Sequence, residues 1–574
     1  MKQKSPDFNS LKQSHNVDSS NLLIIILGWI VIAILVNPLG DFPLNDDWAY
    51  AESVKYLLET GNFQLPGWAV ANLLPQVLWG ALFCLPFGFS FTALRFSTLI
   101  LGLLGIIATY LLFKEISSNK KIALFCALLI AINPIYLALS YTFMTDVPHF
   151  TLSVISLYFF YLGLKKDSLK NIIIALLFAL IALLIRQVTA ALFMGYAMAY
   201  VLKYRGKINY LGISALLFIG LPIVVQSAFS KIFWPKDFGN YGVKEEKFVA
   251  QMTTVDTSLI SNFIYFGLCA LLYLGCFLLP FLILAFLLKC DRIKSSFSRN
   301  LFIASFFFLA TAIASWLISN NQMMPIKGNV IESWGLGPLT LRDTLLLSPK
   351  PLPNNFQLFW TIVTVLSVIG AALLLQFLIL SIGQLFLDQK ISWTKRSLIF
   401  VNGSIGVIYF LPLGMSFFFD RYLLFFLPLL VVMIFHFIGD VNYSKLSFKN
   451  SLFSILMTVA LGVLTISATH DYLSWNRIRW QAIETLRQEK AVSPNQIDGG
   501  FEFNAWHLYD PEYSERKKRK NGEAWWWVEQ DNYLISFSPV EGYEITNKYP
   551  LKNWLPFRSE YILVSQKKNE VTTN

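Results

Sequence analysis

Three acidic residues stand in two short segments that border long apolar runs. Asp46 and Asp47 follow the apolar run 21–40, and Asp146 precedes the run 148–164. A carboxylate can act as a general base or position a reacting group. Asn45 or Asp46 can also be read as the N-cap of the helix that follows, and Asp146 as the N-cap of its own run, because Asp and Asn are favoured there. A cap needs only one acid, so the second acid of the adjacent pair remains unexplained.

Two arginines border apolar runs in the same way. Arg186 lies between the runs 171–185 and 188–202, and Arg421 follows Asp420 just before the run 422–439. A guanidinium binds phosphate oxygens through paired hydrogen bonds, so both are candidates for a phosphate site. For Arg421 the alternative is an anchor at the membrane interface, paired with Asp420.

Arg95 and Arg342 are weaker candidates of the same kind, and other site chemistries have little support in the sequence. The five histidines have no partners at metal-ligand spacing, and the five cysteines lie in or beside apolar stretches. No glycine-rich nucleotide-binding motif occurs. We therefore expect neither a metal nor a cofactor.

The composition identifies the class of protein. Hydrophobic residues make up 55% of the 574 residues and charged residues only 14%, with a mean hydropathy of +0.54. A soluble protein has about a quarter of its residues charged, so this composition indicates a polytopic membrane protein. The net charge of +11 does not indicate a nucleic-acid partner. Residues 469–574 hold 14 Lys/Arg and 15 Asp/Glu, so the excess lies within the apolar part.

Charge-free apolar runs predict the fold class, a mostly α bundle of about 13 transmembrane spans. A span needs about 20 apolar residues. The expected spans are 21–40, 96–113, 122–139, 148–164, 171–185, 188–202, 209–230, 260–288, 301–319, 356–387, 397–416, 422–439 and 451–468. Residues 171–202 are too long for one span and are expected to form two short helices that meet at Arg186. The apolar segment 73–89 is expected to lie at the outer interface.

Loop charge predicts the orientation. With the N-terminal tail 1–20 in the cytoplasm, the inner loops carry 18 Lys/Arg in 52 residues, whereas the outer loops before residue 469 carry 11 in about 135. Positive charge favours the cytoplasmic side. The transmembrane domain 21–468 therefore has outer loops 41–95, 231–259 and 320–355, and the C-terminal domain 469–574 is extracytoplasmic.

The C-terminal domain is expected to be a smaller α/β unit. His470 to Val492 predicts a helix that continues the last span, and strand-like pieces follow Gly499 and Gly500. The charged run 515–520 predicts a solvated loop. The run 524–528 (AWWWV) is expected to pack inside this domain or at the membrane interface.

Five short motifs, taken together, resemble membrane-embedded C-type glycosyltransferases, the relatives of protein O-mannosyltransferases and aminoarabinose transferases. These motifs are NDDWAYAE at 45–52, MTDVP at 144–148, LIRQ at 184–187, GNVIESWGLGPLT at 328–340 and DRYLLFFLP at 420–428. The family often has Asp-Glu where this chain has Asp46-Asp47. The resemblance covers the layout of about residues 20–470.

The resemblance implies a chemistry for these residues. The donor would be a sugar on a polyprenyl phosphate, presented from the membrane. Asp46 would be the general base in a direct displacement with inversion, and Asp146 and Asp47 would position the acceptor or Asp46. Arg186 and Arg421 would bind the donor phosphate. The acceptor, whether lipid, glycan or protein, is not implied.

Two other functions fit part of the sequence. A lipid-linked glycan flippase or transporter would normally carry ionisable groups near mid-membrane, whereas the span interiors here are free of charge. A non-catalytic protein of the same fold could hold a lipid-linked glycan without reacting it.

Overall fold

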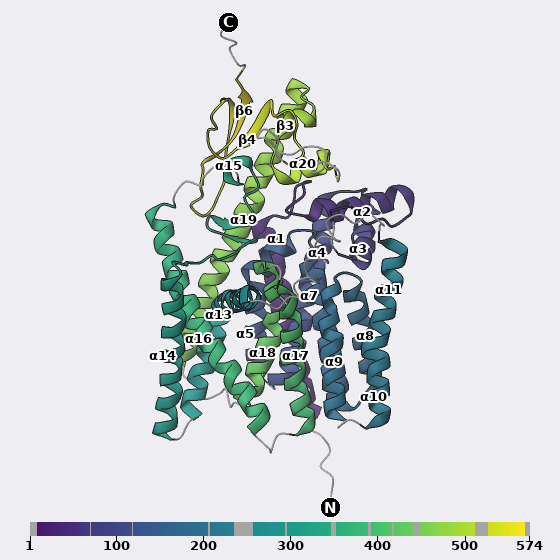
Figure 1. Cartoon of the computed structure of the whole chain (residues 1–574), viewed down its shortest axis with the longest axis vertical. Coiled ribbons are helices and arrows are strands. Elements are labelled where there is room, and N and C mark those ends of the chain that lie inside the picture. Colours follow the sequence, from purple (N-terminus) through teal and green to yellow (C-terminus); the bar gives the residue numbers. More distant parts are fainter. Residues whose placement is uncertain are drawn as a thin grey trace, which may run out of the picture.

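The computed structural model describes residues 8–68, 71–117, 119–204, 207–234, 257–292, 295–345, 352–387, 392–415, 418–439, 448–510 and 526–568. Most of the outer loop 231–259 and the charged run 515–520 lie outside these ranges, so the interpretations made for them are not addressed by the structure. Figure 1 shows a bundle of long helices at one end of the molecule and a smaller part with a sheet at the other. The N-terminus lies at the bundle end and the C-terminus beyond the sheet.

Every predicted span coincides with helix, so the mostly α fold class is confirmed. The helices of the bundle are α1 (Phe8–Val36), α4 (Phe91–Ser117), α5 (Lys120–Ala131), α6 (Pro134–Ser140), α7 (Asp146–Lys166), α8 (Leu169–Leu183), α9 (Ala190–Lys203), α10 (Ile208–Ser214), α11 (Leu221–Phe233), α13 (Thr257–Arg292), α14 (Ser296–Ser319), α16 (Asn354–Leu387), α17 (Trp393–Met415), α18 (Phe426–Ile438) and α19 (Phe448–Lys490).

The count of 13 spans is approximate. Among the described residues, ten helical segments are long and apolar enough to cross a membrane, and the bent pair α5 and α6 makes eleven. The remaining two predicted spans correspond to α8 and α9, with 15 and 14 residues. They are separated at residues 184–189 by a turn, as expected for two short helices that meet at Arg186. Segment 73–89 forms only the short apolar helix α3 (Leu74–Cys84).

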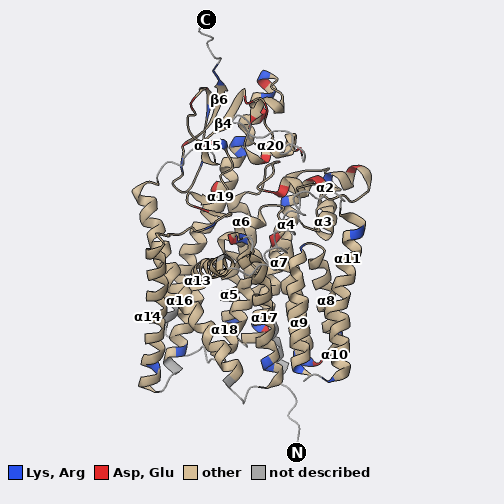
Figure 2. Cartoon of the chain, in the orientation of Figure 1, with Lys and Arg blue, Asp and Glu red and all other residues tan. Residues whose placement is uncertain are grey.

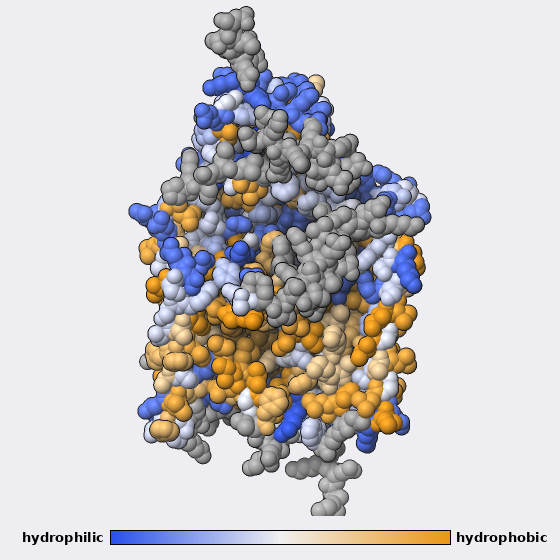
Figure 3. Space-filling view, in the orientation of Figure 1, coloured by the Kyte–Doolittle hydropathy of each residue, from blue (hydrophilic) through white to orange (hydrophobic). Residues whose placement is uncertain are grey.

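The centre of the bundle is formed by α18 and α7. Every residue of α18 is buried, and α7 is buried along most of its length. By contrast α14 and the segment Ile208–Phe233 are mostly exposed apolar surface. Figure 3 shows the resulting broad band of hydrophobic residues on the visible face of the bundle. These features describe a multi-pass membrane protein whose outer helices present apolar side chains to lipid.

Close helix packing depends on small residues where α13 crosses α16. A Cβ atom added at Gly275 would collide with the backbone of Gly370 and Ala371 on the other helix. In a bilayer, close backbone approach of this kind is a main source of helix association, because lipid tails are as apolar as the side chains.

The C-terminal part is an α/β unit joined to the bundle by α19. This helix runs unbroken from the last predicted span to Lys490, as the sequence predicted. The sheet has the order β3-β4-β6-β5, with β3 (Ile497–Asp498) parallel to β4 (Tyr533–Ser536) and the other neighbours antiparallel; β5 is Tyr543–Pro550 and β6 is Tyr561–Lys567. Helix α20 (Phe501–Leu508) follows β3.

An ion pair and two hydrogen bonds tie this unit to the loop 320–345. In the loop 320–345, β1 (Ile331–Glu332) and β2 (Gly335–Leu336) form a small hairpin that precedes α15 (Arg342–Leu345). Arg342 forms an ion pair of 2.7 Å with Asp531, and Asp343 accepts hydrogen bonds from the backbone and hydroxyl of Ser538. Arg342 thus forms a structural contact with the C-terminal unit. The sequence had made it a weaker candidate for binding phosphate.

Candidate active site

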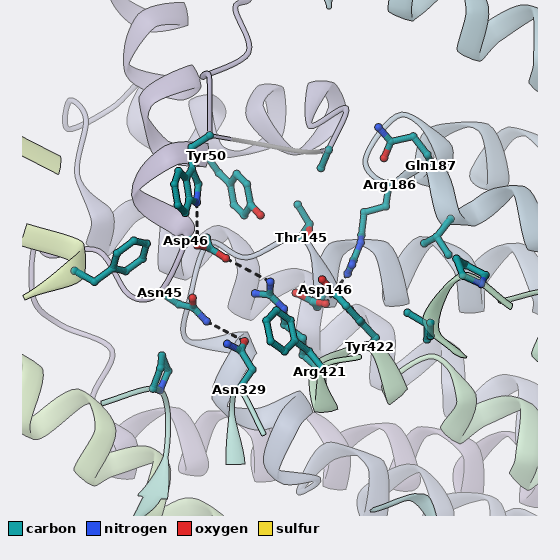
Figure 4. Close-up of a pocket in the computed structure, with 18 of the residues that line it drawn as sticks. Asn45, Asp46, Tyr50, Thr145, Asp146, Arg186, Gln187, Asn329, Arg421 and Tyr422 are labelled. Carbon is teal, nitrogen blue, oxygen red and sulfur yellow. Dashed lines mark hydrogen bonds and ion pairs between the residues drawn. The ribbon is translucent and has the colours of Figure 1, made fainter. Parts of the chain in front are cut away.

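A cavity of about 850 Å³ lies between the C-terminal unit and the end of the bundle that faces this unit. Its lining comes from segments far apart in the sequence, and four of the five predicted site residues belong to it: Asp46, Asp146, Arg186 and Arg421. Figure 4 shows these four side chains around one space, with the arginines next to the acids. Figure 2 shows how few charged residues lie along the helices between the two ends of the bundle.

Asp46 occupies the N-cap position of α2 (Asp47–Thr60) but does not act as a cap through its side chain. Its Oδ1 accepts a hydrogen bond of 3.1 Å from the indole Nε1 of Trp68, and its Oδ2 lies 3.4 Å from Nη2 of Arg421. The carboxylate therefore points into the cavity, with each oxygen held by a different neighbour (Figure 4). The capping interpretation does not account for this orientation.

Asp47 lies apart from the cavity in a buried position. Its two oxygens accept hydrogen bonds from the backbone amides of Leu44 (2.6 Å) and Phe143 (3.0 Å). Burial raises the pKa of Asp47 to about 7, although these hydrogen bonds and the nearby charge of Arg95 act in the opposite direction. Asp47 thus joins the first loop to the segment that leads into Asp146, a position suited to supporting Asp46.

Arg95 completes this support. It is 1% exposed, and its guanidinium donates to the carbonyl oxygens of Pro38, Gly40, Phe42 and Tyr141 at 2.6–3.0 Å. These contacts fix the backbone that leads into both acidic segments. The expectation that Arg95 could bind phosphate in the same site is not met, because it does not line the cavity.

Asp146 and Arg186 form a tight ion pair in the wall of the cavity. Asp146 is the first residue of α7, while Thr145 holds the cap position, so Asp146 is not the N-cap. Its Oδ1 lies 2.5 Å from Nη1 of Arg186. Arg186 stands in the turn between α8 and α9, and Asn72 braces that turn by donating to the carbonyl of Leu183 and accepting from the side chain of Gln187.

Arg421 is buried next to the start of α18, in the short 3₁₀ turn Asp420–Leu423. Asp420 does not pair with its side chain. Instead the Asp420 carboxylate accepts backbone hydrogen bonds from Val330, Ile331 and Arg421 at 2.7–3.1 Å. The Asp420–Arg421 pair of the alternative interpretation is therefore not formed. Asp420 instead holds the loop at Val330 and Ile331, and the guanidinium of Arg421 is directed to Asp46.

Two nitrogens of Arg421 remain available. Nε and Nη1 are buried and have no hydrogen-bond partner among the described residues. The guanidinium packs over the rings of Phe419 and Tyr422, at 5.3 and 5.5 Å from their centroids, and Arg186 lies 5.2 Å from the same Tyr422 ring. A buried unpaired donor costs about 1–3 kcal/mol, so this arrangement favours an anionic ligand.

The lining contains residues that the sequence analysis did not single out. They are mainly aromatic or amide side chains: Asn45, Tyr50, Trp68, Gln187, Asn329, Tyr409, Tyr422, Phe501 and Trp526. Several lie within the family-like motifs, so the motifs themselves were the available signal. Phe501 and Trp526 belong to the C-terminal unit, for which the sequence indicated no role at the site.

The C-terminal unit contacts the first loop directly. Glu502 accepts a hydrogen bond of 3.1 Å from the backbone amide of Asn45, and its other oxygen pairs with Arg479 at 3.0 Å and accepts from the hydroxyl of Thr340 at 2.6 Å. Glu502 and Arg479 are fully buried. The residue before Asp46 is thus fixed by the far end of the chain.

No three His, Cys, Asp or Glu side chains among the described residues lie together in a way that could hold a metal ion. The charged side chains that line the cavity are two carboxylates and two guanidiniums, and they form two ion pairs. Such a site can bind an anion and accept a proton close to it.

Two solved structures align with most of the chain. One is ArnT from Cupriavidus metallidurans bound to undecaprenyl phosphate, at 11% identity and a TM-score of 0.38, with 95% of this chain and 97% of that chain covered. The other is the apo state of the same protein, at 13% identity and a TM-score of 0.36, with coverages of 96% and 98%. No curated protein matches this sequence.

A family comparison gives a segmental match. Residues 75–227 match the model of the family described as dolichyl-phosphate-mannose-protein mannosyltransferase. This segment contains Asp146 and Arg186, together with α4 to α9. Over residues 75–227 the chain is therefore similar to this family, and the motifs at 144–148 and 184–187 lie within the matched segment.

Proposed function

We propose that this chain is an integral-membrane glycosyltransferase that moves a sugar from a polyprenyl-phosphate donor to an acceptor at the outer end of the bundle. The observation that carries the proposal is the convergence of Asp46, Asp146, Arg186 and Arg421 on one cavity, with two donors of Arg421 left unpaired. The family match supports glycosyltransferase activity and a lipid-phosphate donor.

In this proposal Arg421 binds the donor phosphate. Its ion pair with Asp46 is long and uses only Nη2, so Nε and Nη1 can serve a ligand. Arg186 lies by the same Tyr422 ring and adds positive charge to the same region. Because charge on the leaving phosphate grows towards the transition state, a cation held in a buried site contributes to catalysis as well as to binding.

Asp46 is proposed as the general base. The acceptor's hydroxyl or amine attacks the anomeric carbon, the bond from that carbon to the phosphate oxygen breaks, and its electron pair leaves with the polyprenyl phosphate. The acceptor's proton passes to the Asp46 carboxylate. One displacement of this kind inverts the configuration of the anomeric carbon.

The other acids position these groups. Asp146 holds the Arg186 guanidinium at the cavity wall, and Asp47 fixes the backbone at Leu44, just before Asp46, and at Phe143, just before Asp146. Neither role requires contact with the sugar. Correct placement matters because misplacing a catalytic group by about 1 Å can cost roughly 10²-fold in rate.

The proposed orientation puts this cavity on the extracytoplasmic side, with the N-terminus in the cytoplasm and the unit 469–574 outside. The loop-charge asymmetry supports it. Reporter fusions test it: fusions after Asp167 should report the cytoplasm and fusions after Pro494 the outer side. A cytoplasmic signal after Pro494 would contradict the orientation.

The activity is tested by comparing the cell envelope of cells with and without this chain. Mass spectrometry of the lipid, glycan and protein fractions should reveal a component that gains one sugar only when the chain is present. An unchanged envelope, with the protein inserted and folded, would count against transfer and favour a non-catalytic binder.

A further inference from the structure

An aromatic wall lines the cavity beside Asp46. We define the aromatic wall as Trp68 from the first loop and Phe501 and Trp526 from the C-terminal unit, all of which line the cavity. The ring centroids of Trp68 and Phe501 are 5.9 Å apart, and those of Phe501 and Trp526 are 4.8 Å apart. Behind them, Trp48 and Trp527 pack against the same rings, so the wall is supported from outside the cavity.

The Asp46 carboxylate separates this wall from the arginines. Oδ1 accepts its hydrogen bond from Trp68, a member of the wall, whereas Oδ2 faces Arg421. Oδ1 therefore faces the aromatic wall, and Oδ2 faces the guanidinium that is proposed to bind the phosphate. In a direct displacement the nucleophile approaches opposite the leaving group, so a phosphate at Arg421 puts the acceptor near Oδ1 and the aromatic wall.

We propose, on the basis of the proposed function, that the aromatic wall is the acceptor subsite and that the acceptor is a carbohydrate ring. Pyranose rings present C–H groups on their faces, which carry partial positive charge. Aromatic faces carry partial negative charge and offer a flat apolar surface, so the two stack. The hydroxyl of that ring would then lie next to Oδ1 of Asp46.

Polar groups beside the wall fit the edge of such a ring. Asn45 donates through Nδ2 to Oδ1 of Asn329 at 3.3 Å, and both amides line the cavity. The Oδ1 of Asn45 and the Nδ2 of Asn329 have no partner among the described residues and can accept from and donate to sugar hydroxyls. The aromatic rings can pack on the faces of a sugar, and the two amides can bind its hydroxyls, so together they are complementary to a carbohydrate.

A peptide acceptor has less support. Peptides commonly bind by adding a strand to a sheet edge, but no residue of the described strands β1 to β6 lines the cavity. Apart from the two acid–arginine pairs, the described lining contains no charged side chain. Recognition therefore depends on ring faces and amides.

The wall is held in place before any ligand binds. The backbone amide of Phe501 donates to the carbonyl of Thr340 at 3.0 Å, and the next residue, Glu502, bonds to the backbone of Asn45. The C-terminal unit thereby positions both the wall and the segment that carries Asp46. This gives the unit a role in acceptor recognition.

The test compares four variants in cells that otherwise lack the chain. Phe501→Leu and Trp526→Leu remove a ring of the wall but keep an apolar side chain. Phe501→Tyr keeps the ring. Trp506→Leu is the matched control, because Trp506 lies on the same helix α20 but stacks on Phe89 outside the cavity. Protein amount, thermal stability and binding of undecaprenyl phosphate in nanodiscs are measured alongside the envelope products.

We expect the added sugar on a carbohydrate unit, with about tenfold less product for the two Leu variants of the wall, a smaller loss for Phe501→Tyr and near wild-type amounts for Trp506→Leu. Undecaprenyl phosphate binding should be unchanged in all four. Sugar found on protein side chains, or equal losses in Phe501→Leu and Trp506→Leu, would overturn the acceptor subsite while leaving the glycosyltransferase intact. An envelope that does not depend on the chain at all would overturn the proposed function itself.

Discussion

The two ion pairs of the cavity are chemically alike but differ in how completely each is formed. Asp146 and Arg186 are 2.5 Å apart, and the Asp146 side chain is 3% exposed. Asp46 and Arg421 are 3.4 Å apart, and the Asp46 side chain is 21% exposed. In the second pair the carboxylate is shared with Trp68, and the guanidinium keeps two unpaired nitrogens.

From this difference we infer that the Asp146–Arg186 pair mainly stabilises the fold and that the Asp46–Arg421 pair mainly serves activity. A complete buried pair contributes structure, because separating its partners leaves an uncompensated charge. An incomplete pair leaves a carboxylate that can accept a proton, and a guanidinium that can bind an anion, within reach of a substrate. We therefore expect substitutions in the Asp46–Arg421 pair to change activity, and substitutions in the Asp146–Arg186 pair to change stability as well.

The largest effect is expected for Asp46→Asn. The amide has the same shape but cannot take the acceptor's proton, and loss of a general base typically costs about 10²–10⁴-fold in rate. Transfer is measured with purified protein in nanodiscs, with undecaprenyl phosphate binding as the control for folding. Asp47→Asn, the neighbouring control, should reduce transfer less. A greater loss for Asp47→Asn would move the base to the adjacent position.

A stability effect is expected for Asp146→Asn. The substitution leaves Arg186 buried without its countercharge, and breaking a buried pair costs about 3–5 kcal/mol. Thermal unfolding of Asp146→Asn, Arg186→Gln and the double variant forms a cycle, which should show coupling of more than about 1 kcal/mol. The same cycle on Asp46 and Arg421 should show less. Equal coupling in both cycles would remove the distinction between the pairs.

A smaller effect is expected for Arg421→Lys, which keeps the charge but loses the planar fork. We expect about a tenfold higher donor KM and a lower kcat, with thermal stability nearly unchanged. Donor-dependence kinetics in nanodiscs measure both constants. Wild-type kinetics would leave Arg186 as the phosphate ligand and return Arg421 to an anchoring role.

Much of the fold follows from the sequence because a bilayer imposes simple rules. Apolar runs predicted every span helix, and the length limit on a span predicted the break at Arg186. The same limit explains why the count of spans is approximate: α8 and α9 are shorter than a standard span. The continuous helix α19 was also predicted, as an extension of the last span to Val492, and it ends at Lys490.

The site was only partly predictable. Short polar motifs at the ends of apolar runs indicated Asp46, Asp146, Arg186 and Arg421, and the structure brings them together. Residue type and spacing did not distinguish the buried Asp47 from the cavity-facing Asp46, because their difference arises from backbone amides of Leu44 and Phe143. Only the family resemblance assigned the base to Asp46. The contribution of Phe501 depends on how the C-terminal unit docks, which is a long-range contact with no local signature.

The smallest effect concerns the pH dependence of stability, and it separates Asp47 from Asp46. Burial raises the pKa of Asp47 to about 7 from its ordinary 3.8, so the folded protein binds this proton more tightly than the unfolded chain. The resulting stability is fully present below about pH 4 and is lost as the pH rises to about 7. Glu332 and Asp498, whose burial raises their pKa to about 7 and about 6, contribute with the same sign.

Asp47→Asn should therefore reduce, without abolishing, the fall in melting temperature between pH 5 and pH 8. The variant cannot ionise at this position, so it lacks this source of pH dependence. It also loses one backbone hydrogen bond, and its melting temperature should therefore lie further below that of the wild type at pH 5 than at pH 8. Melting curves of the wild type and the variant in nanodiscs at the two pH values measure this difference. Parallel pH profiles would mean that Asp47 is ionised throughout, held by its two amide donors against the effect of burial.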